Sequence, residues 1–109
     1  MKGSSKARAP DLNELEEKAA EVSGTLRLLA NERRLLILCH LTQEAEMSVT
    51  ALGEVIDLSQ SALSQHLAKL REDGLVTTRR DGQTIYYRVA DAKVGRLLSA
   101  LYEIYCRDP

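Results

Sequence analysis

The clearest pattern in the chain is an apolar stripe in its second half. Leu63, Leu67 and Leu70 recur at the spacing of one helix face, which predicts a helix packed on a core. Ser59 is suited to cap the first turn by accepting a hydrogen bond from a backbone N–H, and Gly74 is suited to end the helix in a left-handed conformation. We therefore expect one amphipathic helix with a defined start and a defined stop.

The opposite face of this helix carries small, hydroxyl and amide side chains, where an ordinary solvated helix has Glu and Lys. Such a face suits the major groove of DNA, because amides and hydroxyls hydrogen-bond to base edges. Lys69 is expected to contact phosphates. His66 borders the apolar stripe, so a packed histidine and a phosphate contact fit it equally well. The residues expected to face the bases are Gln60, Ser61, Ser64 and Gln65.

Two short runs of β-branched and aromatic residues follow, at 75–80 and 84–89. Asp81-Gly82 is expected to form the turn between them, because both residues tolerate positive φ. A helix followed directly by such a hairpin is typical of a winged helix-turn-helix. Taken alone, the hairpin fits a structural ribbon with solvated arginines as well as it fits a DNA-binding wing. Its candidate contacts to phosphates or the minor groove are Arg79, Arg80 and Gln83.

Helical patterns occupy most of the remaining chain. Residues 43–47 are expected to form a polar connection, and residues 1–10 a disordered arm. Residues 11–109 are then one mainly α domain with a small β-hairpin wing. The further expected helices span residues 11–22 with a continuation to Asn31, residues 32–41, residues 49–56, and a last helix from Asp91 to about residue 105.

The last helix carries more apolar side chains than one face can bury. Part of it can pack on the domain, and the surplus predicts a homodimer interface shared with the first helix, since exposed patches of that size are uncommon on monomers. The alternative is a last helix that only covers the core. The apolar residues are Val94, Leu97, Leu98, Leu101, Tyr102, Ile104 and Tyr105.

Composition adds little until the charges are located. The net charge of the 109 residues is −1, but residues 59–96 hold seven basic and four acidic side chains, where DNA contacts are expected. No apolar stretch approaches a membrane span and no signal-peptide core begins the chain, so we expect a cytoplasmic protein without membrane contact. No nucleophile–base pair, glycine-rich phosphate loop or metal cluster is recognisable, so we expect neither an enzyme nor a cofactor.

These motifs together resemble the ArsR/SmtB family of bacterial winged-helix regulators, over roughly residues 15–106. The resemblance implies a homodimer that binds double-stranded operator DNA and changes its grip when an inducer arrives. Ser48 and Thr50 stand where metal sensors of the family carry thiols, and Asp91 lacks the histidines of the other family metal site, so we expect no metal site. The matching segments are residues 29–38, 58–70, 73–76, 80–83 and 86–87.

Cys39 and Cys106 are the only cysteines and remain as candidates for sensing. A permanent disulfide is not expected in the cytosol, whereas a reversible link between reactive thiols is plausible. The alternatives are an inert buried thiol at Cys39 and an incidental surface thiol at Cys106.

The surroundings of both cysteines resemble the branch of the family that includes SqrR-, BigR-, HlyU- and YgaV-like regulators. That resemblance implies a repressor in which persulfides join Cys39 to Cys106 through a disulfide or polysulfide bridge. Three alternatives stay open: the same fold sensing a thiophilic metal or metalloid ion or peroxide, an activator that acts by antirepression, and a module that binds only proteins.

Overall fold

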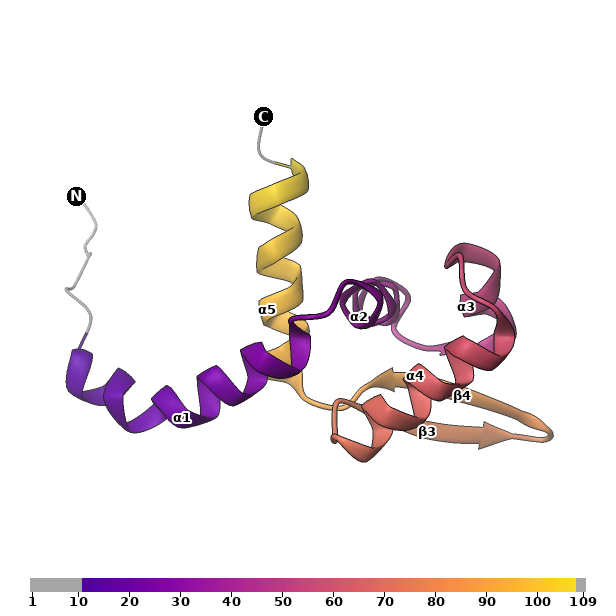
Figure 1. Cartoon of the computed structure of the whole chain (residues 1–109), viewed down its shortest axis with the longest axis horizontal. Coiled ribbons are helices and arrows are strands. Elements are labelled where there is room, and N and C mark those ends of the chain that lie inside the picture. Colours follow the sequence, from indigo (N-terminus) through magenta and orange to yellow (C-terminus); the bar gives the residue numbers. More distant parts are fainter. Residues whose placement is uncertain (1–10, 108–109) are drawn as a thin grey trace.

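The computed structural model describes residues 11–107 as a bundle of helices with one small antiparallel sheet (Figure 1). The arm expected at residues 1–10 lies outside the described residues. The strand order in the sheet is β2-β4-β3, so β4 is central. The elements are α1 (Leu12–Leu29), α2 (Glu32–Glu44), β2 (Met47–Ser48), α3 (Val49–Val55), α4 (Gln60–Glu72), β3 (Val76–Asp81), β4 (Thr84–Val89), α5 (Ala92–Tyr102) and the π-helical turn η1 (Glu103–Arg107).

The winged helix-turn-helix fold predicted from the sequence is confirmed. Side chains from the end of α1 through α5 meet in one core, and the stripe predicted on α4 is fully buried within it. α3 and α4 form the helix-turn-helix, and β3 and β4 form the wing. The buried residues are Leu29, Ile37, Leu38, Leu41, Leu52, Ile56, Leu63, Leu67, Leu70, Leu75, Val76, Val94 and Leu98.

The structure corrects three local expectations. α2 continues to Glu44 instead of ending at residue 41, because Gln and Glu are good helix formers, and the end of the expected polar connection pairs with β4 as strand β2. The central residues of the wing turn are Gly82 and Gln83, one position later than expected. Of these two residues only Gly82 has positive φ, at 64°, as the first central position of a type II′ turn requires. The last helix widens into the π-turn η1 after Tyr102.

α1 projects away from the body of the molecule, and α5 rises from it in another direction (Figure 1). Leu29 is the one residue of α1 that is buried. The apolar side of this helix is open to solvent, with Leu12 69% exposed and Leu26 49% exposed. The end of the last helix is likewise open, with Ile104 59% and Tyr105 79% exposed. Both helices therefore present apolar surface that the rest of the described chain does not cover.

The link between α2 and β2 is strained at Ala45. This residue has φ 72° and ψ −47°, and the N–H of Glu46 donates to the carbonyl of Glu44 at 2.8 Å. That combination is a γ-turn with positive φ, which is rare and strained for a residue with a Cβ. The chain direction into β2 thus depends on an unfavourable backbone conformation.

Replacing Ala45 with glycine is expected to stabilise the protein by about 1 kcal/mol, because glycine adopts positive φ without steric cost. Urea unfolding at one fixed protein concentration measures the change. Ala68→Gly is the matched control: Ala68 is exposed inside α4, where glycine costs about 1 kcal/mol. Equal destabilisation by the two substitutions would contradict the strain at Ala45.

Candidate DNA interface and dithiol site

α4 is held by caps at both of its ends. The N–H of Ala62 donates to the Ser59 hydroxyl at 3.0 Å. At the other end, the N–H of Leu75 donates to the carbonyl of Leu70 at 2.9 Å and Gly74 has φ 79°. This is the six-residue Schellman arrangement, and the two leucines that it joins are both buried. The local signals seen in the sequence therefore fix both the length and the start of the helix.

The outer face of α4 is free of large apolar groups. The four side chains expected to face the bases are all exposed, and so is Lys69. Lys69 lies 3.4 Å from Glu72 and 3.7 Å from Asp73 in exposed ion pairs. His66 is half-buried at the edge of the stripe. The polar side chains on this face are Gln60, Ser61, Ser64 and Gln65.

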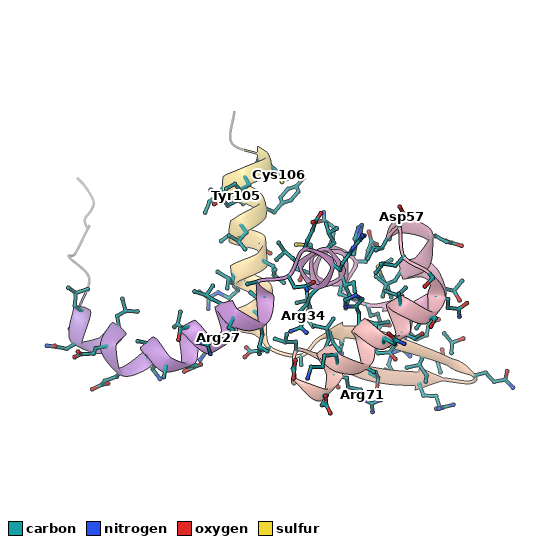
Figure 2. All side chains as sticks on the ribbon, in the orientation of Figure 1. Arg27, Arg34, Asp57, Arg71, Tyr105 and Cys106 are labelled. Carbon is teal, nitrogen blue, oxygen red and sulfur yellow. The ribbon has the colours of Figure 1, made fainter. Side chains whose placement is uncertain are left out.

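Arg34 fastens the C-terminal end of α4 to two other helices. Its Nη1 donates to the Leu28 carbonyl at 2.9 Å and lies 3.5 Å from Asp73 Oδ2. The side chains of Arg34 and Asp73 are only 16% and 19% exposed. Figure 2 shows Arg34 in the space between α1, α2 and α4. One guanidinium therefore joins the end of α1, the start of α2 and the end of α4.

In the wing, Arg79 is already engaged by the protein itself. Its guanidinium forms a two-pronged ion pair with Glu46, with Nε 3.2 Å from Oε2, and lies 4.7 Å above the Tyr86 ring. Ion pairing with Arg79 lowers the pKa of Glu46. Arg80 and Gln83 are exposed near the tip, and Arg80 forms no ion pair within the described residues. The two arginines, adjacent in sequence, thus differ in their surroundings.

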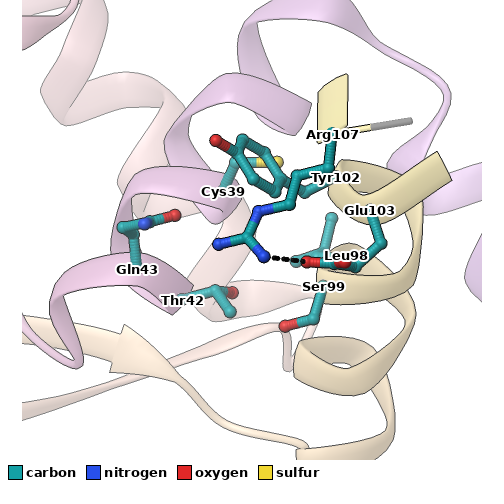
Figure 3. Close-up of a pocket in the computed structure, with 8 residues that line it drawn as sticks. All are labelled: Cys39, Thr42, Gln43, Leu98, Ser99, Tyr102, Glu103 and Arg107. Atoms are coloured by element: carbon teal, nitrogen blue, oxygen red, sulfur yellow. Dashed lines mark ion pairs between the residues drawn. The ribbon is translucent and has the colours of Figure 1, made fainter. Parts of the chain in front are cut away.

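Cys39 lies on α2 and Cys106 on η1, and residues of both elements line one open cavity. Cys39 is half-buried on α2 and lines a cavity of about 270 Å³ between α2 and the last helix (Figure 3). Burial raises the pKa of the Cys39 thiol, and the negative charge of a Cys106 thiolate raises it further. Cys106 is exposed on η1 at the free end of the last helix (Figure 2). Burial therefore makes the Cys39 thiolate harder to form than that of a free cysteine.

Two residues of these sites, Glu46 and Tyr102, were not assigned to them from the sequence. Glu46 lies 33 residues before Arg79, and no local pattern connects the two. Tyr102 was assigned only to the apolar surplus of the last helix, yet it lines the cavity beside Cys39. Arg107 also lines it and pairs with Glu103 at 3.4 Å.

Within residues 11–107, no group of three or more His, Cys, Asp or Glu side chains is placed to hold a metal ion. None of the helices in the described part of the chain combines the length and apolar character that crossing a membrane requires.

Comparison with known proteins gives matches over most of the chain. Residues 31–78 match the family model described as bacterial regulatory protein, arsR family. The transcriptional activator HlyU of Vibrio cholerae is 46% identical over 97 residues, which cover 89% of each chain.

Two solved structures are similar in fold as well as in sequence. Reduced HlyU from Vibrio cholerae has a TM-score of 0.76 and 47% identity, and the match covers 85% of this chain and 97% of that one. The transcriptional repressor BigR from Xylella fastidiosa has a TM-score of 0.81 and 41% identity, covering 89% of this chain and 98% of that one. The likeness therefore extends over nearly the whole of each solved chain.

Proposed function

The chain belongs to the ArsR family of bacterial regulatory proteins, and on this premise we propose that it is a dimeric, persulfide-responsive repressor. The family consists of DNA-binding transcriptional regulators and not of enzymes. The finer proposal has three parts: DNA contact by α4 and the wing, a dimer through the first and last helices, and control of DNA binding by Cys39 and Cys106.

DNA contact is supported by the exposed amides and hydroxyls of α4, which can hydrogen-bond to base edges in a major groove. Lys69 and Arg80 supply positive charge for phosphates on either side of that face. The dimer is supported by the uncovered apolar sides of α1 and the last helix. Two copies of α4 would then meet successive grooves of a two-fold operator.

Arg80→Ala is expected to weaken operator binding and to lower the slope of log affinity against log salt by about 2 per dimer, one phosphate contact per protomer. Arg79→Ala removes the same charge one residue away and is expected to change the slope clearly less, because Glu46 already engages Arg79. Fluorescence anisotropy at several salt concentrations measures both slopes. An equal or larger decrease for Arg79→Ala would mean that Arg79 leaves Glu46 for a phosphate.

The observation that carries the switch is the placement of the chain's only two thiols on α2 and η1, two elements whose residues line the same cavity. Exposed Cys106 is the better first nucleophile. Its thiolate attacks the outer sulfur of a persulfide RSSH, the S–S bond breaks, RSH leaves, and Cys106 retains the sulfur as a persulfide. Cys39 thiolate then attacks the Cys106 sulfur and expels HS⁻, which leaves a disulfide.

A longer bridge needs a second RSSH. If Cys39 also becomes a persulfide, its outer sulfur attacks the Cys106 sulfur, HS⁻ leaves, and a trisulfide remains. Each route balances without another oxidant, because the transferred sulfur is reduced to sulfide. A bridge would tie the last helix to α2 and so change the dimer geometry on which α4 spacing depends.

The test is intact-protein mass spectrometry of fully reduced protein treated with glutathione persulfide or with peroxide, with each sample also assayed for operator binding. After persulfide we expect a bridge between Cys39 and Cys106, either a disulfide or a trisulfide that retains one sulfur, together with loss of operator binding. A response to peroxide alone would mean that the inducer is an oxidant and not a persulfide. Unmodified thiols with unchanged operator binding would overturn the two-cysteine switch.

A second experiment distinguishes repression from activation of transcription, because relatives of this chain are described both as an activator and as a repressor. In transcription reactions with purified polymerase, a repressor lowers transcript from its operator without other proteins. An activator that works by antirepression raises transcript only when a competing DNA-binding protein is present.

A further inference from the structure

We propose that the cavity between α2 and the last helix binds the amino-acid head group of a cysteine-type persulfide, with Arg107 taking its carboxylate and Glu103 its ammonium group. This inference rests on the proposed function and names the class of inducer that the dithiol site would accept. It concerns the binding step that precedes sulfur transfer.

The cavity has the size and the polarity for such a ligand. Its volume of about 270 Å³ is many times the roughly 10–15 Å³ that one water needs, which leaves room for one amino-acid unit. Leu98 and the Tyr102 ring give it an apolar side. Thr42, Gln43 and Ser99 add hydroxyl and amide groups. Cys39 lies in the same lining, and Cys106 directly precedes Arg107 in the chain, so a ligand held by Arg107 would have its sulfur end near the two cysteines.

Charge in the cavity comes as one matched pair. Arg107 Nη1 lies 3.4 Å from Glu103 Oε2, and the guanidinium lies 6.0 Å from the centre of the Tyr102 ring. Figure 3 shows the guanidinium within the cavity, between Glu103 and the two α2 residues Thr42 and Gln43. A guanidinium has five N–H donors, so one carboxylate does not use all of them.

A zwitterion fits this pair better than an ion of either sign. A ligand carboxylate can bind the guanidinium in the two-pronged geometry that arginine favours, while a ligand ammonium binds the Glu103 carboxylate. A purely anionic ligand would meet Glu103, and a purely cationic ligand would meet Arg107. The cavity therefore selects against persulfides that lack one of the two charges.

Stable disulfides test this without relying on persulfide sensing. In a Cys106→Ser background, Cys39 thiolate attacks cystine, the S–S bond breaks, cysteine leaves, and a mixed disulfide remains on Cys39. Cystamine offers only ammonium groups and dithiodipropionate only carboxylates. Intact mass at one fixed pH gives the rate for each reagent, and dividing the rate of each variant by that of the background cancels the reagents' own reactivity.

Arg107→Gln is expected to slow exchange with cystine and dithiodipropionate about tenfold, a factor that corresponds to 1.4 kcal/mol, and not to slow cystamine. Glu103→Gln is expected to slow cystine and cystamine and not dithiodipropionate. Arg96→Gln removes an exposed charge from α5 outside the cavity and is the matched control, with all three rates unchanged. Thermal unfolding checks that the variants fold.

Equal changes for all three reagents, or none in either variant, would overturn the binding site. That result is separable from failure of the proposed function. Charge-selective exchange in a protein whose DNA binding ignores persulfides would keep the site and reject the switch, and a working switch with unselective exchange would do the reverse.

Discussion

Cys106→Ser is expected to abolish release of the operator by persulfide, while the reduced variant binds the operator within about twofold of the wild type. In the wild type we expect treatment to weaken binding by roughly 5–150-fold, the usual range of coupling between two sites. The variant should change less than twofold, because a hydroxyl accepts no sulfur and no bridge can close. Anisotropy titrations before and after glutathione persulfide measure both states.

The small effect on the reduced protein follows from the surroundings of Cys106. Its side chain is exposed on η1, so serine removes no core contact. Cys39→Ser is the companion variant. We expect that persulfide does not release it from the operator either, although substitution at this half-buried position can cost some stability. Release of Cys106→Ser from DNA by persulfide to the wild-type extent would rule out the two-thiol mechanism.

Asp73→Ala is expected to destabilise the protein by about 2 kcal/mol and to lower Tm by roughly 10 °C. The substitution leaves the Arg34 guanidinium in a largely covered position where, among the described residues, only the Leu28 carbonyl remains as its partner. Within residues 11–107, Arg34 Nε already lacks a hydrogen-bond partner although it is buried, so little remains to compensate the charge. Thermal and urea unfolding at one protein concentration measure the loss.

Glu72→Ala is the matched control for this prediction. It removes the neighbouring carboxylate, which is 73% exposed and pairs only with Lys69, and should cost less than about 0.5 kcal/mol. Combining Asp73→Ala with Arg34→Met should recover part of the loss, since the unpaired cation is then gone. If Asp73→Ala and Glu72→Ala lowered the free energy of unfolding equally, the contact between Arg34 and Asp73 would not stabilise the end of α4.

Much of the DNA-binding part of the fold could be predicted because its signals are local. The cap at Ser59, the stripe through Leu67 and the stop at Gly74 each act within a few residues, and the structure has all three. The wing strands were predicted for the same reason. The turn was misplaced by one position because Gly82 alone supplies the positive φ, which leaves Asp81 in the strand.

The remainder could not be predicted because it depends on residues far apart in the chain. β2 exists only because Met47 and Ser48 meet β4, some 40 residues later. The strain at Ala45 follows from the direction that this pairing imposes. The cavity beside Cys39 similarly needs the packing of α2 against the last helix, and nothing in the sequence near Cys39 specifies that its wall is Tyr102.

Cys39 and Cys106 lie on either side of α3, α4 and the wing in the sequence. A bridge between them would close a loop of roughly 67 residues that contains the whole DNA-reading unit, and such a loop removes about 4 kcal/mol of chain entropy from the unfolded state. The bridged molecule would then resist proteolysis longer than the reduced one. A brief exposure to the inducer would leave a persistent pool of inactive regulator, so the rate at which cells restore control would follow thiol reduction and not new protein synthesis.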